Sequence, residues 1–149
     1  MGHAQSAVWV KLPTTGLLWL SSAALYIAAL ANPAVVIDHQ SANTWPGWAL
    51  LLLGWLPLTS AAIGWYANPA FLLSWLLRSR GCDREDLLTA TFALSLSLWV
   101  LVDRKVVVSE APTYGAITHL GLGYWLWVGA MLANLATAAL AFQPQPPVE

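Results

Sequence analysis

The chain has 149 residues, of which 58% are hydrophobic and 9% are charged, and its formal net charge is −1. A typical soluble domain is about one quarter charged, so a soluble bundle of this composition would lack the polar groups needed to cover its surface. The near-neutral charge excludes the clustered basic face of a nucleic-acid-binding protein, and a single cysteine, Cys82, excludes an internal disulfide. We therefore expect a membrane protein, with the lipid bilayer as a partner and no nucleic-acid partner.

The charged residues leave four long charge-free stretches, residues 12–37, 39–77, 87–102 and 111–148. A charge in the middle of a membrane-spanning helix costs about 2.5–3.5 kcal/mol, so a bilayer favours such gaps. The sequence therefore predicts an all-α fold in a single transmembrane domain, residues 1–142, followed by a disordered tail, residues 143–149. The four predicted transmembrane helices cover about residues 14–31, 46–67, 86–103 and 119–142.

Prolines shape the first two predicted helices, at the end of the first and in the middle of the second. The first helix ends at Asn32-Pro33, and the second contains Pro57, which is expected to kink it.

The apolar segment from Phe71 to Leu77 is too short to cross a bilayer. We interpret this segment as a short interfacial helix, or as the tail of the second helix bent at Pro69.

A cleaved secretory signal is an alternative for the first predicted helix. Lys11 precedes its apolar run, and the small-residue sequence Ala-Leu-Ala ends it at Ala31, as in a signal-peptidase site. If this segment were removed, the mature protein would have three transmembrane helices and an N-terminus outside the cell.

The third predicted helix carries opposite charges at its two ends. Asp83, Glu85 and Asp86 lie at its start, where the helix dipole favours anions, and Arg104 and Lys105 lie at its end, where the dipole favours cations. These charges mark both ends of the helix and leave its interior free of charge.

Two β-branched runs, residues 35–37 and 106–108, fall in the first and third loops, on the same side of the predicted bundle. Such runs favour extended backbone, so they predict a two-stranded ribbon over the outer end of the bundle. Two unpaired loops are the alternative, because an isolated pair of strands is marginally stable in water.

The distribution of positive charge predicts the orientation in the membrane. Four helices place both termini on one side, and the positive-inside rule assigns that side to the cytoplasm. The basic residues on the side of the termini are Lys11, Arg78, Arg80 and Arg84, against Arg104 and Lys105 on the other side. We predict that Arg78, Arg80 and Arg84 bind anionic lipid headgroups.

Small side chains recur every four residues along the third and fourth predicted helices. This pattern predicts that the two helices pack closely, on each other or on a second copy of the protein. Asn134 lies one residue from this pattern and deep in the helix, so its side chain is expected to hydrogen-bond across a helix interface. The candidate packing or ligand-binding residues are Gly129, Ala133, Asn134 and Thr137 in the fourth helix and Thr89 and Ser97 in the third.

The outer side carries three further polar candidates, Asp38, His39 and His119. Structural zinc normally has four ligands with recognisable spacing, and this chain shows no such pattern, so we predict no metal ion and no cofactor. Solvent-exposed loop residues are the simpler interpretation of the three side chains.

Three sequence elements resemble those of a group of small bacterial inner-membrane proteins of unknown activity. These elements are PGWALLLLGW and GWYANPAFLLSWLL, which together span Pro46 to Leu77, and GYWLW, within Gly121 to Val128. The resemblance implies a location in the bacterial cytoplasmic membrane and implies no particular activity or functional residue.

The sequence favours a non-enzymatic scaffold or accessory subunit that binds other membrane helices or a second copy of itself. One alternative is a small oligomeric transporter or channel, with Asn134, Thr137, Thr89 and Ser97 along a polar path. Another is a membrane enzyme acting on a lipid or a quinone through the outer-face polar residues.

Overall fold

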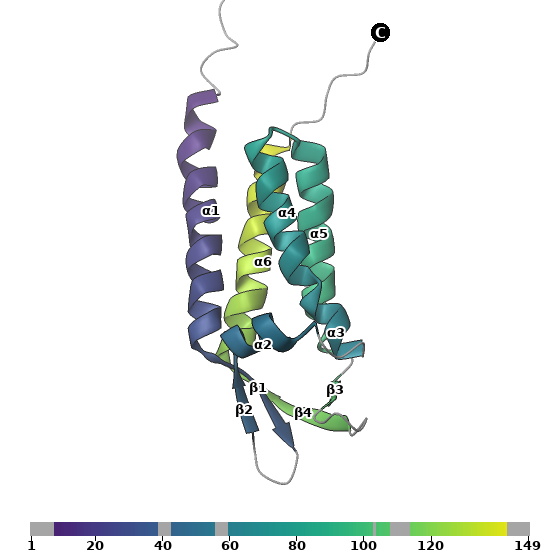
Figure 1. Ribbon diagram of the computed structural model, residues 1–149. Coiled ribbons are helices and arrows are strands. Elements are labelled where there is room, and N and C mark those ends of the chain that lie inside the picture. The colour runs from purple at the N-terminus through teal and green to yellow at the C-terminus, as the bar shows by residue number, and fades with distance from the viewer. Residues whose placement is uncertain (1–7, 39–42, 56–59, 103, 108–113, 143–149) are drawn as a thin grey trace, which may run out of the picture.

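The described part of the chain forms a bundle of long helices with a small β-sheet at one end (Figure 1). The structure is a computed structural model that describes residues 8–38, 43–55, 60–102, 104–107 and 114–142. In chain order the elements are α1 (Val8–Ala31), β1 (Pro33–Asp38), β2 (Asn43–Pro46), α2 (Gly47–Leu53), α3 (Ser60–Trp65), α4 (Ala67–Ser79), α5 (Asp83–Trp99), β3 (Lys105–Val107), β4 (Tyr114–Leu120) and α6 (Leu122–Ala141).

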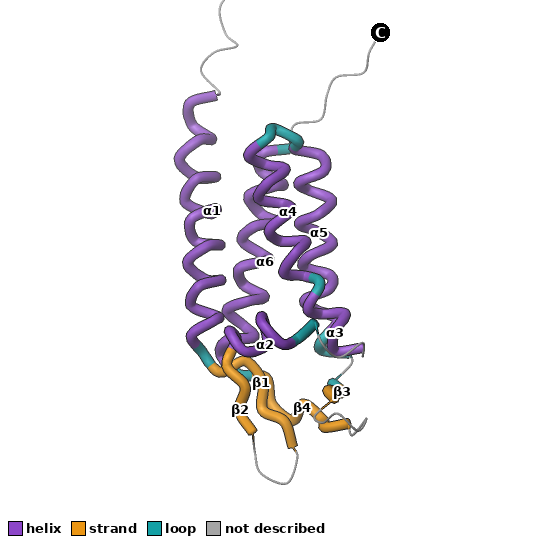
Figure 2. The backbone as a smooth tube through the Cα atoms, in the orientation of Figure 1, coloured by secondary structure: helices purple, strands orange, loops and turns teal. Residues whose placement is uncertain are grey.

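Four of the helices, α1, α4, α5 and α6, run alongside one another (Figure 2). Helix α6 packs against α1 on one side and against the α4–α5 hairpin on the other. Between the helices, Phe71 of α4, Ala93 of α5 and Met131 of α6 are buried in one hydrophobic cluster. The ring of Phe71 stacks on Tyr26 of α1, with centroids 5.0 Å apart, which links α1 to α4.

The sheet has four antiparallel strands in the order β2-β1-β4-β3 and closes one end of the bundle. Successive side chains of a strand point to opposite faces. Accordingly Val35 and Ile37 of β1 and Ile117 of β4 are buried against Tyr124 of α6, whereas Thr118 is exposed. The sheet therefore covers the ends of the helices with one apolar face.

The predicted all-α fold with four transmembrane helices is wrong. The chain contains a four-stranded sheet, and two helices of the described part are long and apolar enough to cross a membrane, over Thr14–Ala31 and Leu122–Ala141. Helix α4 has 13 residues, and the 17 residues of α5 include a charged first turn, so both apolar segments are shorter than the about 20 residues typical of a membrane span. The absence of charge identified apolar segments but did not fix the lengths of the helices.

The single helix predicted over residues 46–67 is replaced by two separate short helices, α2 and α3. Helix α2 lies across the bundle near the sheet (Figure 1). Helix α2 ends at Leu53 and is followed by a turn at Gly54 and Trp55. Pro57, the site of the predicted kink, lies outside the described residues. Pro69 lies in the first turn of α4, where a missing N–H costs no hydrogen bond.

The predicted interfacial helix over Phe71 to Leu77 is also wrong, because these residues belong to α4. Phe71 and Ser74 are 1% and 0% exposed, so this part of α4 packs inside the bundle.

The predicted two-stranded ribbon is wrong as well. Both β-branched runs contribute strands, β1 and β3, but β4 lies between them. Because β4 pairs with β1 on the side opposite β2, the backbone of β1 forms hydrogen bonds on both sides. In a two-stranded ribbon, each strand would form them on one side only.

Close packing at Gly123 of α6 gives a prediction about stability. A Cβ atom there would lie 2.6 Å from the carbonyl oxygen of Asn32 and 3.0 Å from that of Ala29, and backbone cannot move away as a side chain can. Gly123→Ala is expected to lower the free energy of unfolding by about 1–3 kcal/mol. Gly16→Ala on α1, where a Cβ would meet nothing within 4 Å, is expected to raise it by about 0.4–1 kcal/mol. Unfolding titrations of both variants in a mild detergent would measure this difference in sign.

Candidate functional site

A tight turn between α4 and α5 builds the most polar region of the bundle interior. Gly81 has a φ of +72°, the left-handed conformation that glycine adopts without strain. Its N–H donates to the carbonyl of Arg78, and the N–H of Cys82 donates to that of Leu77, both at 3.0 Å, which is the hydrogen-bond pattern of a Schellman motif. The turn reverses the chain and brings Arg78 of α4 next to Asp86 of α5.

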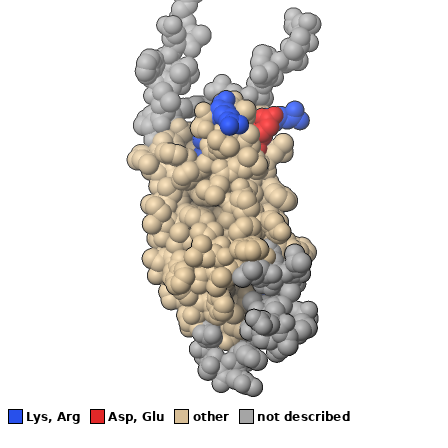
Figure 3. All heavy atoms as spheres, in the orientation of Figure 1, with Lys and Arg blue, Asp and Glu red and all other residues tan. Residues whose placement is uncertain are grey.

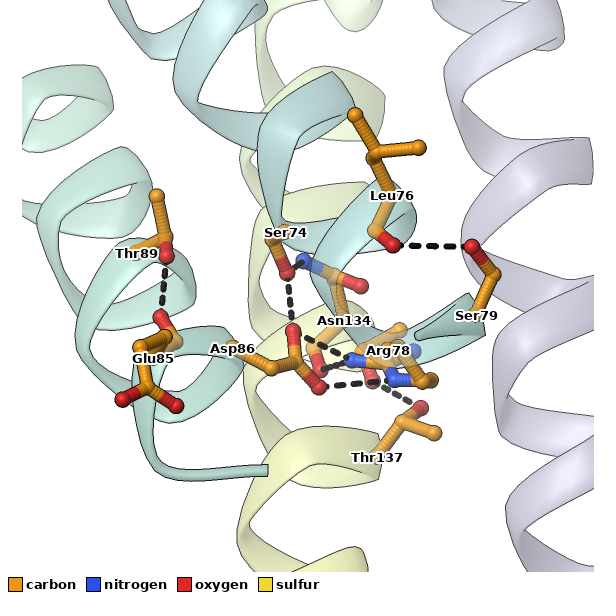
Figure 4. A network of polar contacts seen from close by, with 10 residues as sticks. Ser74, Leu76, Arg78, Ser79, Glu85, Asp86, Thr89, Asn134 and Thr137 are labelled. Carbon is orange, nitrogen blue, oxygen red and sulfur yellow. Dashed lines mark hydrogen bonds and ion pairs between the residues drawn. The ribbon is translucent and has the colours of Figure 1, made fainter. Parts of the chain in front are cut away.

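Arg78 and Asp86 form an ion pair in the interior of the bundle (Figure 4). The Nε atom of Arg78 donates to Oδ2 of Asp86 at 2.8 Å, and Nη2 donates to Oδ1 at 3.2 Å. Asp86 is fully buried, whereas the side chain of Arg78 is 16% exposed. This two-point contact fixes the guanidinium plane relative to the carboxylate.

Two further polar side chains extend the ion pair to α6. Ser74 donates from Oγ to Oδ1 of Asp86 at 2.5 Å, and Asn134 donates from Nδ2 to Oγ of Ser74 at 2.8 Å. Nη2 of Arg78 also donates to the backbone carbonyl of Asn134 at 3.2 Å. We call Ser74, Arg78, Asp86 and Asn134 the polar network. It connects α4, α5 and α6, and three of its four residues are fully buried.

The polar network keeps hydrogen-bonding capacity that the described residues do not use. Nη1 of Arg78 and Oδ1 of Asn134 are buried and have no partner among those residues. A buried polar atom without a partner costs about 1–3 kcal/mol. The network therefore presents one additional donor and one additional acceptor near the point where the three helices meet.

A second polar group lies closer to the sheet and connects α1, α4 and α6. Oδ1 of Asn68 accepts hydrogen bonds from the Tyr26 hydroxyl at 3.0 Å and from Nε1 of Trp127 at 2.9 Å. Nδ2 of Asn68 donates to the carbonyl of Trp65 at 3.0 Å. The amide of Asn68 thus holds three segments together at a position where the sequence indicated only a helix end.

The candidate residues of α6 have different surroundings. Asn134 is fully buried and forms hydrogen bonds to α4, and Thr137 is 2% exposed and donates to the carbonyl of Ala133 in its own helix. Gly129 faces α1, where a Cβ would lie 3.7 Å from Leu25. The regular spacing therefore does not place all of these residues in one interface.

The two candidates of α5 are also separated. Ser97 is fully buried, and its backbone carbonyl accepts a hydrogen bond from the hydroxyl of Tyr124 in α6 at 3.0 Å. Thr89 is half-buried and donates to the carbonyl of Glu85 within α5, away from the polar network (Figure 4). Of the pair, Ser97 belongs to the contact between α5 and α6.

The three arginines expected at lipid headgroups differ in exposure. Arg80 and Arg84 are exposed at the end of the bundle where the α4–α5 turn lies. The side chain of Arg78 points instead into the bundle and is bound to Asp86 (Figure 4). The sequence predicts Arg78 at the lipid headgroups and Asp86 at a helix start, as two separate groups. Their opposite charges on the two sides of the Gly81 turn are the signal that could have identified the pair.

The outer-face polar candidates are only partly described. His119 is exposed on β4, opposite Val36 in the register, and Asp38 ends β1 opposite Ala116. His39 lies outside the described residues. Within the described part of the chain, no group of three or more His, Cys, Asp or Glu side chains could hold a metal ion.

Asn134 offers a test of the polar network. Asn134→Leu removes the hydrogen bond to Ser74 and is expected to lower the free energy of unfolding by about 0.5–1.5 kcal/mol, the usual net contribution of one hydrogen bond. Thr91→Val is a suitable control, because the Thr91 hydroxyl is exposed and bonds only to the carbonyl of Leu87 in its own helix. Equal unfolding midpoints for the two variants would show that the contact of Asn134 contributes nothing.

No protein-family model matches this chain, and no curated protein or solved structure is similar to it. The interpretation of the polar network and of the surrounding surfaces therefore depends on the geometry of this chain alone.

Proposed function

We propose that this protein is a membrane-inserted scaffold or accessory subunit without enzymatic activity, and that it binds other membrane helices. In this proposal α1 and α6 cross the cytoplasmic membrane of a bacterial cell. The observation that carries it is the exposed apolar surface of α1, which has no partner element on its outward side among the described residues.

The low burial of α1 and α6 supports insertion into a membrane. Only 11% of the residues in the apolar window of α1 and 33% in that of α6 are buried, whereas the core helix of a soluble protein is mostly buried. Large apolar side chains are exposed on both helices, including Leu20 (58%), Ile27 (68%) and Leu132 (57%). Such a surface is stable in hydrocarbon and costly in water.

The distribution of charge supports the same proposal. On the face seen in Figure 3, coloured charged side chains gather at the end of the bundle next to the α4–α5 turn, and the described surface below them on this face is uncharged. Arg80 and Arg84 belong to that end. By the positive-inside rule we propose that this end faces the cytoplasm and that the sheet lies on the opposite side.

The use of the polar groups supports a scaffold more than a catalyst or a transporter. Ser74, Arg78, Asp86 and Asn134 bind one another between three helices, so most of their hydrogen bonds hold the bundle together. The cavity described below is lined by other residues, so it provides no polar path along Asn134, Thr137, Thr89 and Ser97.

Co-purification of two differently tagged copies from membranes in a mild detergent tests the proposal. We expect each copy to be recovered together with a second copy or with another membrane protein. Leu20→Trp together with Ile27→Trp, which alter the exposed face of α1, should reduce this recovery. The control Leu88→Trp changes a side chain of α5 that is also exposed (62%) and should not reduce it. Recovery of a lone monomer would contradict the proposal.

A further inference from the structure

A cavity of about 130 Å³ lies where the helices meet the sheet. Its walls come from the end of α1, from α2 and α3, and from the first turns of α4 and α6, together with Val35 of β1, Ile117 of β4 and Val100 just after α5. Small residues at several wall positions, among them Ala29 and Ala34, leave the space open. The cavity is distinct from the polar network, which lies nearer the other end of the bundle.

The chemistry of the cavity wall favours an apolar ligand. Four wall residues carry polar side-chain groups, and each of the four already donates one hydrogen bond within the protein. Nε1 of Trp65 donates to the carbonyl of Leu51, the Tyr124 hydroxyl donates to that of Ser97, and Trp127 donates to Asn68, whose own amide donates to Trp65. The rest of the described wall is hydrocarbon and backbone. A polar ligand would therefore find little side-chain hydrogen-bonding capacity there.

Exposure along the wall indicates the side from which the cavity opens. Most wall residues of the sheet, α5 and α6 are buried, for example Val35 (4%), Ile117 (5%) and Tyr124 (4%), and Trp127 is half-buried. Leu30 of α1, Leu51 of α2 and Trp65 of α3 are only half-buried. The cavity therefore has a buried floor and opens between α1, α2 and α3. Next to this opening, Leu52 of α2 is 61% exposed, so the surroundings of the opening are apolar too.

We propose that this cavity binds the end of a hydrocarbon chain of a bilayer lipid, which enters between α1 and α2. An apolar cavity of about 150 Å³ in a protein stays dry and accepts a molecule of the size of benzene, so 130 Å³ suits a few carbon atoms of a chain. The proposal rests on the proposed membrane insertion of α1, because a bilayer supplies such chains at the opening. Bound lipid would fill the space beneath α2 and fix this short helix to the bundle.

A phospholipid that carries a photoreactive diazirine at the end of one acyl chain tests this proposal in nanodiscs. After illumination, mass spectrometry locates the labelled residues. We expect adducts on cavity residues, such as Leu50, Trp65 and Trp127, in addition to adducts on the exposed Leu17 and Leu20 of α1. Leu51→Phe fills the cavity and should abolish the adducts on the cavity residues, whereas Leu52→Phe on the exposed side of α2 should leave them unchanged.

A second pair of variants keeps the test valid if Leu51→Phe fails to fold. Leu30→Phe fills the cavity from α1, and Ile27→Phe is its exposed control. Labelling of Leu17 and Leu20 without labelling of the cavity residues would overturn the lipid-chain proposal and leave membrane insertion intact. Labelling of neither set would overturn both. Cavity adducts that persist in both filled variants would also overturn it, because the label would then reach those residues by another route.

Discussion

Replacing Asp86 by alanine is expected to lower the free energy of unfolding by about 3–5 kcal/mol, the usual cost of removing one partner from a buried ion pair. The variant leaves the Arg78 guanidinium without its carboxylate and leaves the Ser74 hydroxyl without its acceptor. Asp86 is fully buried, so the guanidinium loses its counter-charge in the protein interior, where that loss costs most. Titration from a mild to a denaturing detergent, followed by circular dichroism, would measure the loss.

Two further variants separate the ion pair from other effects of the substitution. Asp83→Ala removes an exposed carboxylate from the same first turn of α5, and we expect a loss below about 1 kcal/mol from its interaction with the helix dipole. Arg78→Met combined with Asp86→Leu replaces the pair with apolar groups and should recover most of the stability lost in Asp86→Ala. Equal losses in Asp86→Ala and Asp83→Ala would refute the structural role of the pair.

Replacing Phe71 by alanine is expected to lower the free energy of unfolding by about 3–5 kcal/mol, because it creates a cavity among well-packed groups. Phe71 is 1% exposed, and the centroid of its ring lies 5.0 Å from the ring centroid of Tyr26 and 5.2 Å from that of Trp75. Loss of the ring removes one of the two aromatic contacts between α1 and α4 among the described residues, the other being Trp19 with Trp75. We therefore also expect α1 to become more sensitive to proteolysis in the variant.

Phe92 provides the matched control for Phe71. It lies on α5 and is 57% exposed, so Phe92→Ala leaves no cavity and should change the free energy of unfolding by no more than about 0.5 kcal/mol. The same unfolding titration applies to both variants. A larger loss for Phe92→Ala than for Phe71→Ala would mean that the packing around α4 differs from that described.

The positions of several helices could be predicted from the sequence because local signals determine them. Asn32-Pro33 ends α1 at Ala31, since proline cannot continue a helix and Nδ2 of Asn32 donates to the carbonyl of Ala28 at 2.8 Å. The acidic residues from Asp83 onward mark the first turn of α5, where they are favoured by the helix dipole. Such signals act within one turn and need no knowledge of the tertiary structure.

The sheet could not be predicted in full because its strand order depends on contacts between distant segments. The β-branched runs indicated extended backbone in β1 and β3, but nothing local in residues 114–120 indicated that β4 would pair with both. The charge-free stretch that begins at residue 111 predicts His119 at the start of a helix. The structure places it in β4, and α6 begins after Gly121.

The polar network was missed for a related reason. Asp86 lies in the first turn of a helix, where the helix dipole favours an acidic residue, so its charge has a local explanation that requires no partner on another helix. Only the reversal of the chain at Gly81 brings Asp86 to Arg78 and Ser74, and only the packing of α6 adds Asn134. Of these four residues, the sequence indicated the interior position of Asn134 alone, from its depth in an apolar helix.

The accessibility of single cysteines in nanodiscs tests most directly whether hydrocarbon surrounds α1 and α6. In a Cys82→Ser background, Leu20→Cys and Leu132→Cys each place a thiol on an exposed apolar face, and Arg80→Cys places one at the exposed α4–α5 turn. We predict that a water-soluble maleimide labels the thiol of Arg80→Cys and leaves the other two unlabelled until a denaturing detergent is added. Labelling of Leu20→Cys and Leu132→Cys as fast as Arg80→Cys would contradict the proposed membrane insertion.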